Sequence, residues 1–276
     1  VAKSGGGGIT STLGIHAGRQ FVCDLKNVFL INNSAEYGGG LNLGAVKGEF
    51  YNVSLINNSA VEGGAVYNSG NLNFNKFTIE ANSAKNGAAI YNKGTLILTN
   101  SNILLNNATN GAIYNVKNLI LDKSNLILNN AVKGGVIFNN ANLNVSGSNL
   151  NSNHASEGGV IYNNAVTNIK NSVINTNNAD NYGGVVYNAG NLSVDNSKFN
   201  SNEAFMAGVI YNAGMFVRLN NAIFNNNEAT RGAVIQTSAD LIILNSKFEN
   251  NVVTHSLGVI NVANGNVNIS KSTFNS

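Results

Sequence analysis

Thirteen carboxylates are the side chains of this 276-residue chain that could carry acid–base chemistry. Cleavage of a polysaccharide needs two such groups held close together, often beside a lysine or arginine. Most of the acids here stand alone. Glu36, Glu62, Glu157 and Asp180 do recur at one point of a repeat, but lysines occupy the same neighbourhood in other copies. This pattern is typical of a solvated loop edge. We therefore expect no catalytic residue and no enzyme activity, and a polysaccharide-active enzyme is the second alternative function.

Metal and cofactor chemistry have equally little support in the sequence. His16, His154 and His255 lie far apart, and the single Cys23 offers no zinc-type spacing. The run Gly5–Gly8 has the glycine content of a phosphate-binding loop, but no Gly-Lys-Ser/Thr follows it. We expect a turn or cap there, with no metal and no cofactor.

Aromatic side chains are the better candidates for binding. One set recurs at a fixed place in the repeat, where it forms either a structural stack that covers a sheet or a platform for glycans and partners; we favour the stack. A second set replaces polar residues in a predicted turn and would form an exposed apolar contact point. The first set is Tyr67, Tyr91, Tyr114, Phe138, Tyr162, Tyr187 and Tyr211, and the second is Tyr182, Phe205 and Met206.

A short sequence repeat, with a period of roughly 24 residues, organises these positions. The phrase Gly63-Gly64-Ala65-Val66-Tyr67-Asn68 returns in variants to the end of the chain, together with an apolar residue followed three places later by asparagine. A period of this size indicates one supersecondary unit stacked on copies of itself. We expect an irregular glycine-rich segment or cap over residues 1–20 and a repeat domain over residues 21–276.

Within one repeat, residues 65–68, 72–74 and 77–79 alternate in polarity with period two, which indicates strands. Three short strands per repeat predict a parallel β-helix, an all-β solenoid, and the general preference for right-handed crossovers predicts its hand. Its first inward column is expected to be Val66, Ile90, Ile113, Ile137, Ile161, Val186, Ile210, Val234 and Ile260.

Asparagine forms two further columns at predicted turns, where it tolerates left-handed backbone and its amide can bond the copies above and below. We expect structural ladders. One column is Asn68, Asn92, Asn115, Asn139, Asn163, Asn188 and Asn212. The other is Asn33, Asn58, Asn82, Asn106, Asn129, Asn153, Asn177, Asn202, Asn227 and Asn251.

Composition excludes other classes. The net charge is +3 without a basic run, so we expect no nucleic acid partner. No stretch approaches the ~18 apolar residues of a membrane-spanning helix. Charged residues make up only 11% of the chain, as suits a fold in which like charges would stack about 4.8 Å apart.

The two phrases together resemble the repeats of chlamydial polymorphic outer-membrane proteins and of asparagine-rich adhesin-like proteins of methanogenic archaea. Gly63-Gly64-Ala65-Val66 matches the first motif, and Phe199…Asn202, Phe224…Asn227 and Phe248…Asn251 match the second. The resemblance covers about residues 30–276. Valine replaces a small residue in several copies, and Leu or Ile replaces Phe in six.

What the resemblance implies is an extracellular, surface-displayed and non-catalytic adhesin passenger or stalk, whose partner is a cell-surface protein or glycan. The alternative is a self-assembling subunit of an extracellular filament or sheath, since an open solenoid end exposes unpaired strand edges that invite end-to-end or lateral association.

Overall fold

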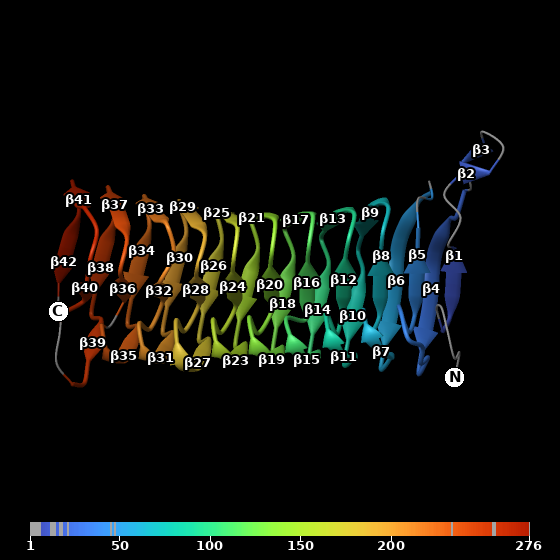
Figure 1. The fold of residues 1–276 in the computed structure, drawn as a ribbon, viewed down its shortest axis with the longest axis horizontal. Coiled ribbons are helices and arrows are strands. Elements are labelled where there is room, and N and C mark those ends of the chain that lie inside the picture. Colours follow the sequence, from blue (N-terminus) through green and yellow to red (C-terminus); the bar gives the residue numbers. More distant parts are fainter. Residues whose placement is uncertain are drawn as a thin grey trace.

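The computed structural model describes residues 7–11, 15–16, 19–20, 22–44, 46, 48–232, 234–255 and 258–275. The regular elements of these residues are strands, stacked as a β-solenoid of about ten turns with roughly 24 residues per turn. Figure 1 shows the coils in sequence order along the long axis. The predicted all-β parallel solenoid is confirmed.

The first sheet consists of the strands that follow the glycine phrase, each pairing in parallel with its counterparts one coil away. Its described strands are β1 (Ile9–Ser11), β5 (Leu41–Leu43), β8 (Val66–Asn68), β12 (Ile90–Asn92), β16 (Ile113–Asn115), β20 (Ile137–Asn139), β24 (Ile161–Asn163), β28 (Val186–Asn188), β32 (Ile210–Asn212), β36 (Ile235–Thr237) and β40 (Ile260–Val262).

The second sheet is the largest and carries both remaining predicted strands of each coil. Its strands are β4 (Leu25–Ile31), β6 (Phe50–Ile56), β9 (Asn71–Asn75), β10 (Thr78–Glu80), β13 (Thr95–Thr99), β14 (Asn102–Leu104), β17 (Asn118–Asp122), β18 (Asn125–Ile127), β21 (Asn142–Ser146), β22 (Asn149–Asn151), β25 (Val166–Lys170), β26 (Val173–Asn175), β29 (Asn191–Asp195), β30 (Lys198–Asn200), β33 (Phe216–Asn220), β34 (Ile223–Asn225), β37 (Asp240–Leu244), β38 (Lys247–Glu249), β41 (Val267–Ser270) and β42 (Thr273–Asn275).

The third sheet lies where we predicted a turn leading into the glycine phrase. Its strands are β7 (Ser59–Glu62), β11 (Ser83–Asn86), β15 (Asn107–Asn110), β19 (Asn130–Lys133), β23 (His154–Glu157), β27 (Asn178–Tyr182), β31 (Glu203–Met206), β35 (Glu228–Arg231) and β39 (Val252–Val253). The three-sided solenoid is correct, but the sides are divided differently. The predicted turn at Asn75-Lys76 is only a bend within the second sheet, because Lys76 has a φ of 56°.

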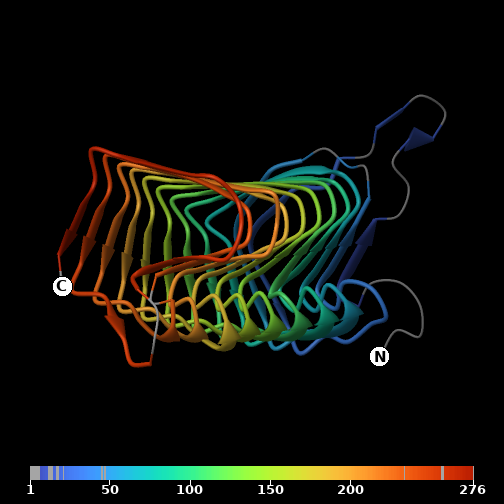
Figure 2. The same cartoon turned by 60° about the vertical axis from the view of Figure 1, so that its left-hand side comes forward.

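The N-terminal segment joins the solenoid earlier than the expected boundary at residue 20. Ile9–Ser11 pairs in parallel with Leu41–Leu43, so this part extends the first sheet. An antiparallel pair, β2 (Ile15–His16) with β3 (Arg19–Gln20), projects from this end (Figures 1 and 2). Gly5 and Gly6 lie outside the described residues.

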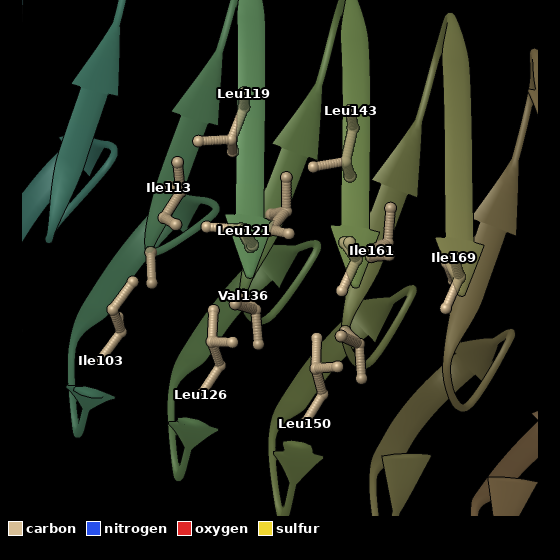
Figure 3. Close-up of a cluster of buried hydrophobic side chains, with 14 of the residues drawn as sticks. Ile103, Ile113, Leu119, Leu121, Leu126, Val136, Leu143, Leu150, Ile161 and Ile169 are labelled. Carbon is tan, nitrogen blue, oxygen red and sulfur yellow. The ribbon is translucent and has the colours of Figure 1, made fainter. Parts of the chain in front are cut away.

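The core is a set of apolar columns between the sheets. Figure 3 shows Ile113 and Ile161 of the first sheet in one buried cluster with Leu119, Leu121 and Leu143 of the second. These side chains are fully buried, and each aliphatic residue buried in this way contributes about 1.5–3 kcal/mol. The columns therefore supply the main stabilisation of each coil.

One predicted member of the first column is wrong. Ile235, not Val234, pairs with Ile210 and Ile260. The step from Ile210 to Ile235 is one residue longer than the step from Val186 to Ile210. Counting with a constant period therefore selects Val234, the residue before the one that occupies the column. Val234 is nevertheless buried, because the residue before this column also faces the interior.

Corners use left-handed backbone, but not at the asparagines for which we predicted it. The residue immediately before each asparagine of the second column has a φ between 52° and 60°. At two corners this residue is leucine, and Leu105 and Leu128 are about half exposed. A left-handed conformation costs roughly 1–2 kcal/mol for most residues, whereas Asn adopts it more readily. Asn57, Asn226 and Asn250 stand at the same corner of other coils.

Leu105→Asn is therefore expected to raise the free energy of unfolding by about 1 kcal/mol, because it relieves the left-handed strain at an exposed position without opening a cavity. The measurement is the urea denaturation midpoint.

Leu104→Asn is the matched control, since Leu104 is the preceding residue and lies within strand β14. It should be neutral or destabilising. An equal gain from both substitutions would attribute the effect to surface polarity and contradict the backbone explanation.

Candidate functional site

The second asparagine column is a continuous buried ladder. Asn58 Nδ2 donates to Asn82 Oδ1 at 3.1 Å, and the Asn58 main-chain N–H donates to the same oxygen at 2.8 Å. Asn82 Nδ2 in turn donates to Leu55 O and to Asn106 Oδ1, both at 3.0 Å. The pattern repeats to Asn251. These amides are saturated by the fold, so they are structural and offer no group to a ligand.

The first asparagine column is a second buried ladder. Asn68 Nδ2 donates to Asn92 Oδ1 at 2.8 Å, and Asn68 Oδ1 accepts the N–H of Gly70 at 2.8 Å, which closes the turn into the second sheet. The column continues to Asn212, whose Nδ2 donates to Thr237 Oγ1 at 2.9 Å. Among the described side chains no buried nitrogen or oxygen lacks a partner. Both predicted ladders are confirmed.

The aromatic column lies on the outer face of the first sheet, opposite the buried Val and Ile column. Its seven rings stack with centroid separations of 4.6–5.4 Å and interplanar angles of 3–24°. Tyr37 contacts Tyr67 edge-on at 5.4 Å, and Tyr182 leans on Tyr211 at 4.7 Å. Ring faces are thus largely occupied by other rings. A ligand could reach chiefly edges and hydroxyls, which favours the structural stack over the platform.

The polar edges of this column are also engaged. Asn140 Nδ2 donates to Tyr114 Oη at 3.0 Å, and Lys133 Nζ lies 4.7 Å from the Tyr162 ring centroid. Burial raises the pKa of Tyr187 to about 12, with a smaller contribution from Tyr162. The stack therefore favours the neutral phenol.

Tyr182, Phe205 and Met206 do not form the single contact patch that we predicted. Tyr182 and Met206 are partners in the third sheet and only partly exposed, and the Tyr182 ring packs against the aromatic column. Phe205 points to the outer face and is 47% exposed. The strand β27 contains an irregularity in register between Ala179 and Tyr182, which carries Tyr182 away from the outer face. Whether any of the three binds a partner stays a prediction.

A shallow depression of about 300 Å³ surrounds Phe205 on the third sheet, and Asn178, Asp180, Glu203 and Thr230 help to line it. Beside it, His154 lies between Asn130 Oδ1 at 2.9 Å and Asp180 Oδ1 at 3.0 Å. His154 lies within strand β23.

A larger hollow of about 520 Å³ lies on the outer face of the second sheet, near the N-terminal end. Its lining includes Lys26, Glu49, Tyr51, Asn73 and Asn75. Sequence reasoning missed it, because these residues belong to three different coils. The available signal was Tyr51, an aromatic residue at an outward position where the coils from Asn75 to Asn220 carry polar ones.

Within the described residues, no three or more His, Cys, Asp or Glu side chains form a group that could hold a metal ion. In the same part of the chain, no helix has the length and hydrophobicity needed to cross a membrane.

The buried ladder generates a stability prediction. Asn106→Ala removes Asn106 Oδ1, which accepts from the main chain and the side chain of Asn82, and Asn106 Nδ2, which donates to Ile79 O and Asn129 Oδ1. Because each buried group left without a partner costs about 1–3 kcal/mol, we expect a loss of about 3 kcal/mol or more in chemical denaturation.

The control is Asn149→Ala. Asn149 is exposed and its side chain donates only to Asn125 Oδ1 at 2.9 Å, so its loss should cost less than about 0.5 kcal/mol. Similar effects of the two substitutions would show that the buried ladder adds nothing beyond a surface amide bond.

The aromatic column generates a pH prediction. The folded state raises the pKa of Tyr187 above the ordinary value of 10, so it holds this proton more tightly than the unfolded chain does. The resulting stabilisation is present below pH 10 and is lost as the pH rises toward 12. We expect the denaturation midpoint to fall over that window.

Tyr187→Phe tests the assignment, since Phe138 shows that the column accepts phenylalanine. The variant should lack the late tyrosinate absorbance step and lose less stability between pH 10 and 12. An unchanged alkaline titration would assign the step to another tyrosine.

In comparisons with known proteins, no family model, no curated protein and no solved structure matches the chain.

Proposed function

We propose that the chain is the stalk and binding surface of an extracellular, non-catalytic cell-surface adhesin. The observation that carries the proposal is the unbroken pair of buried asparagine ladders, which fixes each coil to the next. Ten coils at about 4.8 Å each form a rod of roughly 50 Å. A rod of this kind holds a contact surface at a set distance from its attachment point.

The contrast between the two faces of the second sheet supports the same function. The inward positions are apolar in almost every coil, as in Leu72, Leu96 and Leu119, with Thr167 as the exception in this column. The neighbouring outward column varies freely, through Asn73, Ile97, Ile120, Asn144, Asn168, Ser193 and Arg218. An interior that remains largely apolar beneath an exterior that varies suits a scaffold that displays contacts. The resemblance of the repeats to adhesin-like surface proteins points the same way.

A filament or sheath subunit is the second candidate, and it too is supported by a specific observation. In the last described coil, Val267, Ile269 and Phe274 continue the core columns but are 39–45% exposed. Phe274 stacks on Phe248 at 4.6 Å on one side only among the described rings. A second copy that stacked in register on this strand edge would cover these groups.

Beads coated with the purified chain are expected to attach to cells saturably, and excess soluble chain should compete with them. Beads coated with an unrelated protein of similar charge are the control. Attachment equal to the control would overturn the adhesin proposal.

Sedimentation velocity at micromolar concentration separates the two candidates. An adhesin stalk should sediment as a monomer, whereas concentration-dependent growth into long particles would favour the filament subunit.

A further inference from the structure

The hollow beside Tyr51 has the composition of a ligand site. From it we infer that the chain binds a neutral sugar unit of a glycan at Lys26, Glu49, Tyr51, Asn73 and Asn75. This inference rests on the proposed adhesin function and names its ligand class.

The hollow has a suitable size. Its volume of about 520 Å³ falls within the range of about 300–1,000 Å³ that is usual for small-molecule sites, whereas the depression at Phe205, at about 300 Å³, is at the lower limit. The buried Phe50 and the backbone of Gly48 contribute to its lining. The Phe50 side chain itself packs in the core, so the ring of Tyr51 is the apolar part that the hollow offers beside its polar walls.

The polar groups of the lining match hydroxyl groups rather than a single charge. Lys26 and Glu49 form an ion pair and are still 53% and 72% exposed, so each has further hydrogen-bonding capacity. Asn73 and Asn75 contribute amides, which both donate and accept. Vicinal hydroxyls of a sugar likewise donate and accept, so one pyranose can use all four groups.

Charge favours a neutral ligand. The positive charge of Lys26 is balanced by Glu49 within the lining. Asp24 lies close behind, since its Oδ1 accepts the main-chain N–H of Glu49 at 2.8 Å. With Lys76 Nζ at the Tyr51 hydroxyl, two ammonium groups face two carboxylates, so the hollow has no net positive charge that would attract an acidic sugar.

Tyr51 offers a ring that no other aromatic ring covers, which the stacked rings of the aromatic column do not. None of the described aromatic rings stacks on it, and it is 38% exposed. Lys76 Nζ donates to Tyr51 Oη at 2.7 Å and lies 5.0 Å from the ring centroid, which fixes the ring in place. A fixed aromatic ring with accessible surface presents the negative π-face on which the C–H groups of a sugar pack.

The test is binding of the intact chain to a panel of neutral and uronic acid oligosaccharides, followed by saturation-transfer NMR and by calorimetry. At least one neutral oligosaccharide should bind, and Tyr51→Ala and Asn75→Ala should each weaken that binding at least tenfold. Circular dichroism confirms that the variants fold, and Glu49→Gln offers a second test that preserves side-chain shape.

The double variant Lys133→Ala/Glu157→Ala is the matched control. It removes another lysine–glutamate pair, with an N···O distance of 3.5 Å, beside Tyr162, whose ring is stacked on both sides. Binding should be unchanged in this variant.

Three results would overturn the inference: no neutral sugar binds, uronic acids bind more tightly than neutral sugars, or the Tyr51 and Asn75 variants bind as the unaltered chain does. The bead assay keeps the two proposals apart. If beads carrying Tyr51→Ala still attach to cells, the adhesin proposal stands without this site. If sugars bind in the hollow but no beads attach, the site stands without adhesion.

Discussion

Parallel, in-register stacking is the constraint on which every other feature of this molecule depends. Each side chain meets its own counterpart about 4.8 Å away in the next coil, so a residue type is acceptable only if it tolerates contact with itself. Asparagine satisfies this rule inside the solenoid because one amide both donates and accepts. Aliphatic and aromatic residues satisfy it by packing and stacking, as Phe199, Phe224 and Phe248 do in the core. Charges do not satisfy it, which explains their scarcity.

The same constraint explains how much of the fold could be predicted. The repeat, the inward columns and both asparagine ladders were readable, because in-register contact imposes a recurring residue type. The third sheet was missed because its inward position is filled by a small residue, as at Ala155 and Ala179, and most of the outward residues are polar. A strand of this composition has the sequence pattern of a turn. Val234 was wrongly placed in the inward column because this coil is one residue longer than the coil before it, which shifts the alternation of inward and outward residues. Only the pairing of Ile210 with Ile235 shows which residue occupies the column.

Candidate binding residues were harder to predict than the fold. A residue type that recurs at one position of successive coils is one that packs against or bonds to its own copies, so its recurrence does not indicate a ligand. The aromatic column recurs because its rings satisfy one another, so its faces are not offered to a ligand. Tyr51 does not recur, and its neighbours in space come from adjacent coils that are distant in sequence. The polar composition of that hollow follows from the register of three coils, which a linear pattern does not contain.

The direction in which the side-chain amides donate along the solenoid differs between the interior and the surface. In the second asparagine column, each side-chain oxygen faces the preceding coil and accepts a main-chain N–H there, as Asn82 Oδ1 accepts from Asn58. In the first column, the oxygen accepts the main-chain N–H two residues on in its own coil, as Asn68 Oδ1 accepts from Gly70. In both columns the amide nitrogen donates to the asparagine of the following coil. On the surface the direction is reversed: Asn149 donates back to Asn125, and Asn125 back to Asn102. Backbone saturation therefore sets the polarity of the interior but leaves the surface free. The interior transmits any substitution to both neighbouring coils, whereas a surface position can change alone. This asymmetry allows a solenoid to acquire a local binding site such as the Tyr51 hollow without losing its register.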